Sequence, residues 1–132
     1  MRIETTLEQM KDSYDWGTIF GEDHGYSDGD YASNPQAVTG DLKAAEAKIG
    51  FVRLEDIEEL LGSVDGERDG LPWIAVVKLK NGFYLAVSAG CDYTGWDCHA
   101  GGSSWVASTL DLLLQGGVSD NERVRLEVPY NE

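Results

Sequence analysis

The chain has 132 residues, 42% of them hydrophobic, and a formal net charge of −14. This length suits one compact domain, and four Trp and six Tyr bring more apolar surface than a disordered chain carries. We therefore expect a single folded domain over residues 1–132. Twenty-four acidic residues against ten basic ones reverse the charge that nucleic-acid binding requires, which argues against direct contact with DNA or RNA.

The N-terminal residues do not match the pattern of a secretory signal, so export by that route is not expected. Glu4 follows closely on Arg2, where a secretory signal would continue into an apolar run. The longest nearly apolar stretch, residues 71–77, is far shorter than the roughly 20 residues that span a bilayer. With two cysteines, the sequence predicts a soluble cytoplasmic protein with reduced thiols and no membrane partner.

Capping signals and helical spacing mark the first 20 residues. Thr6 precedes Gln9 by three positions, as in a capping box, and apolar residues follow at helical spacing. One helix is expected, ending near Trp16 or Phe20. Residues 21–40 are rich in Gly, Asp, Ser and Asn and have no period, so they are predicted to form a long polar loop. Loops of this length are often functional surfaces.

A second helix is predicted from an apolar stripe that ends before Gly62. The stripe consists of Leu54, Ile57, Leu60 and Leu61. The opposite face is acidic and consists of Glu55, Asp56, Glu58 and Glu59. It belongs to the more acidic half of the chain, because residues 1–70 hold 17 acidic and 6 basic residues.

The clearest pattern in the chain is a β-hairpin. Two runs rich in β-branched and aromatic residues, 73–80 and 83–89, flank Asn81-Gly82. Asn-Gly favours a two-residue type I′ turn, in which both residues have positive φ. Such a turn pairs Leu79 with Tyr84, and both faces of the hairpin are expected to be largely buried.

The remaining elements complete the expected fold. A third strand is predicted to begin near Trp96 or Asp97 and to end near Val106. Ser108 or Thr109 then caps a short helix that Gly116-Gly117 ends, and a capping box at Ser119 starts a last helix or extended segment. The predicted fold class is α+β: a small antiparallel sheet of about three strands, with the Asn-Gly hairpin at its centre, flanked by short helices.

Residues 91–99 concentrate thiols, carboxylates, aromatic rings and an imidazole. The candidate ligand or structural residues in this run are Cys91, Asp92, Tyr93, Trp96, Asp97, Cys98 and His99. A structured turn is the favoured interpretation, and a disulfide or a thiol nucleophile stays an alternative. Zinc ligands usually lie two to four residues apart, whereas Cys98 and His99 are adjacent, so no metal, cofactor or catalytic residue is assigned.

This run also resembles a known family. Small bacterial and phage proteins share a Cys-Asp-Tyr-Thr-Gly-Trp-Asp-Cys loop after a hairpin and a Tyr-Asp-Trp motif near the N-terminus, here Tyr14-Asp15-Trp16. The resemblance covers residues 73–123 and does not extend to residues 21–50. It supports the predicted fold and implies no particular activity.

Two classes of function follow from these patterns. The first is an acidic, non-enzymatic interaction protein, such as a phage-type inhibitor, that binds a basic or nucleic-acid-binding protein. Its predicted contact residues are Asp23, Asp28, Asp30, Glu55, Asp56, Glu58 and Glu59. The second is a small-ligand or metal-binding module built from the loop at residues 91–99. Acidity that serves only solubility is an equally weighted alternative to the first.

Overall fold

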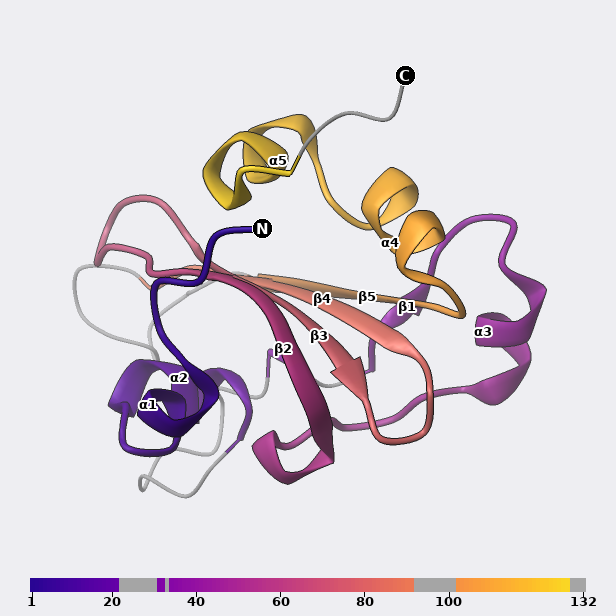
Figure 1. The fold of residues 1–132 in the computed structure, drawn as a ribbon, viewed down its shortest axis with the longest axis horizontal. Coiled ribbons are helices and arrows are strands. Elements are labelled where there is room, and N and C mark those ends of the chain that lie inside the picture. Colours follow the sequence, from indigo (N-terminus) through magenta and orange to yellow (C-terminus); the bar gives the residue numbers. More distant parts are fainter. Residues whose placement is uncertain (22–30, 33, 92–101, 129–132) are drawn as a thin grey trace.

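A computed structural model of the chain describes residues 1–21, 31–32, 34–91 and 102–128. The described residues form one mixed sheet with helices on both of its faces (Figure 1). The helices are α1 (Leu7–Lys11), α2 (Tyr14–Ile19), α3 (Leu42–Ala47), α4 (Leu110–Gly116) and α5 (Asp120–Leu126), with a 3-10 turn, η1 (Leu54–Asp56). The strands are β1 (Gln36–Ala37), β2 (Ile57–Val64), β3 (Trp73–Leu79), β4 (Tyr84–Ala89) and β5 (Gly102–Ala107).

The fold is α+β as predicted, but the sheet has five strands rather than about three. Its order is β1-β5-β4-β3-β2, and only the short β1 runs parallel to its neighbour, β5. β1 lies within the segment predicted as polar loop. β5 contains residues 102–106 of the predicted third strand, whose expected start at Trp96 or Asp97 lies outside the described residues.

The helix predicted at residues 54–61 is wrong beyond its first turn, because residues 57–64 form the edge strand β2. Two register shifts, at Glu58 and Leu61, interrupt its pairing with β3. Each shift inserts one extra residue into β2. In a regular strand, residues three positions apart point to opposite faces, but the extra residue between Ile57 and Leu60 places both on the same face of the sheet. A bulged strand can therefore show the apolar spacing of a helix.

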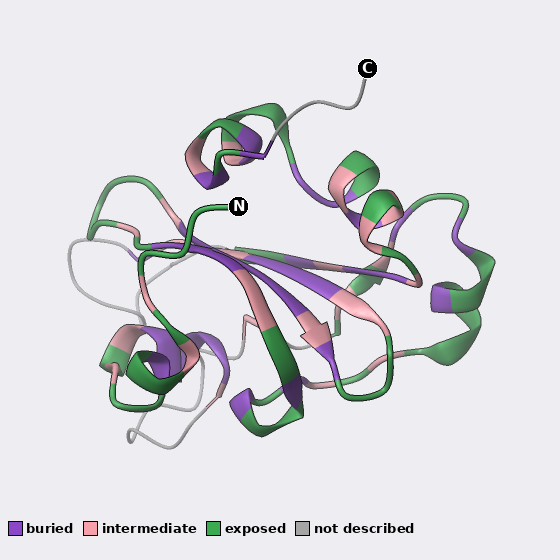
Figure 2. Cartoon of the chain, in the orientation of Figure 1, coloured by how far each residue is buried: buried purple, intermediate pink, exposed green. Residues whose placement is uncertain are grey.

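The sheet separates two hydrophobic clusters (Figure 2). The helices α1 and α2 cover one face, where Trp16 and Phe20 pack with Val77 and Leu85 of the central strands. The helices α4 and α5 cover the other face, on which their buried residues include Leu113 and Leu126. The central strands are buried on both sides, as expected for the hairpin.

The hairpin pairs one residue out of the predicted register. Val77 lies opposite Leu85 rather than Ala86. The loop has three residues: the Leu79 N–H donates to the Phe83 oxygen at 2.8 Å, and the Gly82 N–H donates to the Leu79 oxygen at 3.0 Å. Of Asn81 and Gly82 only Gly82 has a positive φ, 93°, which matches a turn closed by a glycine bulge and not a type I′ turn.

Local capping predictions are confirmed at three helices. Thr6 forms the expected capping box with Gln9, Thr109 caps α4, and Ser119 forms a capping box with Glu122 that starts α5. The single N-terminal helix is in fact two, because Ser13 caps a new helix by accepting the Trp16 N–H at 3.2 Å. Within the described ranges, no helix has the length and apolar character needed to cross a bilayer.

Replacing Gly82 by Ala is expected to lower the free energy of unfolding by about 1–2 kcal/mol. A Cβ at this position meets no atom within 4 Å, so the loss comes from the left-handed backbone alone. Gly50 is the matched control, since it is equally open and has no left-handed φ. Gly50→Ala should change stability by less than about 0.5 kcal/mol in urea unfolding. Equal losses in the two variants would contradict this account of the turn.

Candidate functional site

The predicted acidic run lies at one edge of the sheet. Glu55 and Asp56 belong to η1, Glu58 and Glu59 begin β2, and all four are exposed. The structure brings these four together because η1 continues directly into the edge strand. The other three predicted contact residues, Asp23, Asp28 and Asp30, lie outside the described residues.

Several charges of this run have local roles. The Asp56 carboxylate accepts the Arg53 N–H at 2.9 Å, which caps η1. Glu58 lies 3.5 Å from the Lys78 ammonium; Glu58 is exposed and Lys78 is partly buried. Exposed charges and bulges also keep an edge strand from pairing with a strand of another chain. Glu58 and Glu59 can therefore be explained as protection of the sheet edge against such pairing, and this explanation requires no binding partner.

A more enclosed acidic feature lies where the N-terminal segment meets α1 and α2. A hollow of about 620 Å³ there has ten described lining residues. Four of them carry carboxylates: Glu4, Asp12, Asp15 and Asp65. None of the described residues of the lining is a Lys, Arg or His. Two Trp, Trp16 and Trp73, belong to its inner wall and are only 1% and 5% exposed.

Pairing of residues 2–5 with β2 builds one side of this hollow. The Ser63 N–H donates to the Arg2 oxygen at 2.9 Å, and the Glu4 N–H donates to the Ser63 oxygen at 3.0 Å. The buried Ser63 hydroxyl donates to the Thr5 oxygen at 2.7 Å and accepts the Thr5 N–H at 3.1 Å. These bonds hold Glu4 and Thr5 next to the end of β2, where Asp65 follows.

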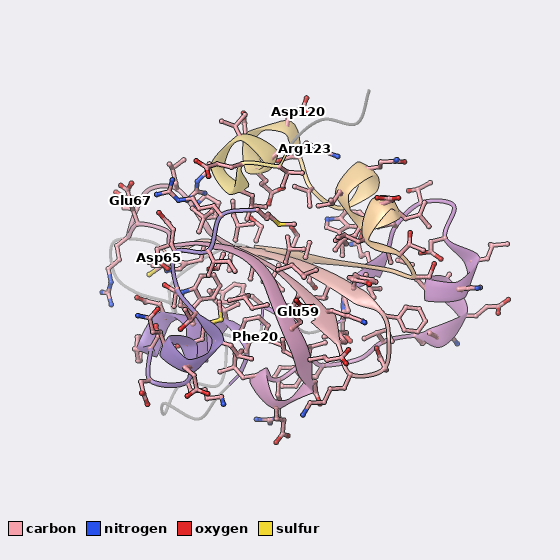
Figure 3. The ribbon with its side chains drawn as sticks, in the orientation of Figure 1. Phe20, Glu59, Asp65, Glu67, Asp120 and Arg123 are labelled. Atoms are coloured by element: carbon pink, nitrogen blue, oxygen red, sulfur yellow. The ribbon has the colours of Figure 1, made fainter. Side chains whose placement is uncertain are left out.

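Hydrogen bonds fix two of the four carboxylates. Asp65 Oδ1 accepts the Thr5 hydroxyl at 2.6 Å and the Trp16 Nε1–H at 3.0 Å. Glu4 Oε1 accepts the Asp65 N–H at 2.8 Å, while its Oε2 lies 2.8 Å from Arg2. Figure 3 shows Asp65 and Glu59 apart along the strand, so the hollow and the acidic run are separate places.

This arrangement suits a cation. Fixed carboxylates attract an ammonium or guanidinium group, and charged hydrogen bonds of this kind are the stronger ones. Trp16 and Trp73 form the inner wall of the hollow but are almost fully buried, so the attraction comes mainly from the carboxylates. A neutral group gains no charge attraction here, and an anionic group is repelled.

The structure describes only the first residue of the predicted loop site. Cys91 is 4% exposed and packs in the cluster under α1 and α2, and its oxygen accepts the Asp69 N–H at 2.8 Å. The other predicted residues, Asp92, Tyr93, Trp96, Asp97, Cys98 and His99, lie outside the described residues. In the part of the chain that is described, no three His, Cys, Asp or Glu side chains are grouped to hold a metal ion.

Sequence patterns missed the carboxylates of the hollow. Asp15 was noted only within the Tyr14-Asp15-Trp16 motif, and Glu4, Asp12 and Asp65 were not singled out. Asp65 is 49 residues from Trp16 and 60 from Thr5, its two hydrogen-bond partners. No spacing rule connects residues so far apart. The usable signal was weak: two carboxylates, Asp12 and Asp15, a few positions before Trp16.

Comparisons with protein-family models, curated proteins and solved structures found no significant match to this chain. The resemblance to small bacterial and phage proteins therefore stays a prediction, and the candidate site depends on geometry alone.

Proposed function

We propose that this protein works by binding a partner protein that presents a basic segment, and that a Lys or Arg side chain of that segment enters the hollow beside α1 and α2. The observation that carries this proposal is the lining of the hollow: four carboxylate residues, of which Glu4 is paired with Arg2, and no cation among the described lining residues. The partner class includes nucleic-acid-binding proteins, because surfaces that hold phosphates are basic. No catalytic step is needed for this function.

Net charge supports the proposal at longer range. A chain of −14 attracts a basic partner before contact and raises the rate of association. The acidic run Glu55–Glu59 adds to this attraction from the neighbouring edge of the sheet. Affinity and orientation then depend on the hollow, where the bonds of Asp65 and Glu4 hold the carboxylates in place.

The test compares two double variants of equal net charge. Asp12→Asn with Asp15→Asn removes two carboxylates from the hollow, whereas Glu46→Gln with Asp111→Asn removes two exposed ones from α3 and α4. The probe is a fluorescently labelled oligolysine peptide, titrated at low salt. We expect the hollow variant to bind about tenfold more weakly and the control about twofold more weakly.

The comparison separates a local site from general attraction. Both variants lose the same charge, so long-range attraction to the peptide falls equally in both. Equal weakening would show that the hollow has no special role and would overturn the proposal. Circular dichroism spectra of both variants should match the parent protein, which excludes a loss caused by unfolding.

A further inference from the structure

A second pocket lies on the opposite face of the sheet from the acidic hollow, between α5, the ends of β4 and β5, and residues 71–72. Its volume is about 310 Å³. Ser88 of β4 lines the pocket. Its neighbours Val87 and Ala89 pack toward α1 and α2, so the Ser88 side chain points to the other face of the sheet. The pocket is thus separate from the hollow in place, and it differs from it in charge, because it contains an arginine, Arg125.

Backbone carbonyls hold this arginine in one direction. Arg125 Nη1 donates to the Pro72 oxygen at 2.6 Å, and its Nη2 donates to the Asp65 oxygen at 3.1 Å. Both acceptors are neutral, and a guanidinium has five N–H donors, so donors remain for a ligand. Within the described residues no carboxylate lies close enough to Arg125 for an ion pair, unlike Arg2, Lys11 and Lys78.

The rest of the lining combines hydroxyl groups with an apolar wall. Ser88 and Ser103 are directly opposite each other on β4 and β5. Leu71 and Pro72 form the apolar part, and Leu71 is 53% exposed. Among the described lining residues, Glu122 is the one with a carboxylate. Its Oε1 accepts the Ser119 N–H at 2.8 Å, as part of the capping box of α5.

We infer that this pocket binds a small organic carboxylate. The guanidinium of Arg125 pairs with the carboxylate group, the hydroxyls of Ser88 and Ser103 donate to the same oxygens, and the hydrocarbon part packs on Leu71 and Pro72. A planar guanidinium matches two carboxylate oxygens at once, which a lysine cannot do. The volume is at the lower end of ligand pockets, so the ligand is of metabolite size.

A carboxylate can come from a free organic acid or from the C-terminus of a peptide. Hexanoate represents the first source and N-acetylleucine the second, and the two corresponding amides are the uncharged controls. Titration is followed by amide chemical shifts in ¹H–¹⁵N spectra of the whole chain. We expect one or both acids to shift the signals of Ser88, Ser103 and Arg125 with a Kd of about 1 mM, and the amides to leave them in place.

Variants test the role of each group. Arg125→Lys keeps the charge but loses the two-pronged geometry, and should weaken binding of the acid about tenfold. Ser88→Ala removes a hydroxyl without touching the bonds of Arg125, and should weaken it about threefold. Arg53→Lys, outside the pocket, is the control and should leave affinity unchanged.

Three results would overturn the inference: equal shifts with acids and amides, unchanged affinity in both pocket variants, or no shift at ligand concentrations far above the expected Kd. The pocket is lined by other residues than the acidic hollow, although Arg125 donates to the backbone oxygen of Asp65, so peptide binding is also measured for Arg125→Lys. Loss of peptide binding in the hollow variant and loss of acid binding in the pocket variants are separate measurements, so one proposal can fail without the other.

Discussion

Replacing Trp16 by Ala is expected to lower the free energy of unfolding by about 3–5 kcal/mol, the usual cost of removing a buried aromatic side chain. Trp16 is 1% exposed and stacks with Phe20, with the ring centroids 6.5 Å apart. It also joins α2 to the sheet, since its Nε1–H donates to Asp65 Oδ1. Urea unfolding followed by far-ultraviolet circular dichroism measures this loss without relying on the fluorescence of the deleted ring.

Trp16→Phe separates packing from the hydrogen bond. Phenylalanine keeps most of the apolar contact with Phe20 but cannot donate to Asp65, whose Oδ1 still accepts the Thr5 hydroxyl. We expect a smaller loss, about 1–2 kcal/mol. A Trp16→Ala loss below about 1 kcal/mol would show that α2 is not part of the core. Trp16→Ala also removes part of the lining of the acidic hollow, so the affinity for the oligolysine peptide should fall as well.

Replacing Asp41 by Ala is the second prediction with a large effect, a loss of about 2–4 kcal/mol. The buried Asp41 carboxylate accepts the Ala44 N–H at 3.2 Å, which caps α3, and the Ser108 N–H at 2.6 Å, just after β5. Alanine leaves both donors without this acceptor. Thermal and urea unfolding measure the loss, and Asp111→Ala, at an exposed position of α4, is the control with a change below about 0.5 kcal/mol.

The same carboxylate predicts a dependence of stability on pH. Burial raises the pKa of Asp41, but hydrogen bonds from the Ser108 N–H and hydroxyl and from the Ala44 and Lys43 N–H groups together lower it more, so the pKa lies below its usual value of 3.8. The folded protein thus binds the proton less readily than the unfolded chain. This contribution to stability is fully present above the unfolded pKa and is lost as pH falls through the lower folded pKa.

Asp41→Asn measures this dependence directly. Asparagine keeps one oxygen for the cap but is never charged, so the stability difference from the parent protein should be largest near neutral pH. It should shrink as pH falls below about 4, because the unfolded chain then binds a proton at Asp41 before the folded protein does. A difference that stays constant from neutral pH to about pH 2.5 would contradict the lowered pKa.

Sequence patterns succeeded where the relevant contacts are local. The capping boxes at Thr6 and Ser119 join residues three positions apart, and both are present in the structure. The hairpin is also present, because two long apolar runs around Asn81-Gly82 have few alternatives. Its register was wrong by one residue, since the same Gly82 fits both a two-residue and a three-residue loop and both faces of the hairpin are buried.

Helix α3 shows how a weak pattern is missed. Its sequence, from Leu42 to Ala47, buries only Ala44 and exposes Leu42, so it has no apolar stripe. Asp41 as cap and residues of high helix propensity were the available signals. The short β1 had none, because two residues cannot show a period.

By itself, the sequence determined the α+β class, the central hairpin, the caps of α1, α4 and α5 and the strong negative charge, because each depends on composition or on residues a few positions apart. Only the tertiary structure decided the edge strand at residues 57–64, the acidic hollow and the bond between Asp41 and Ser108, 67 residues apart. These features arise when packing brings distant segments together. In β2, bulges let a strand bury apolar residues whose sequence spacing is that of a helix.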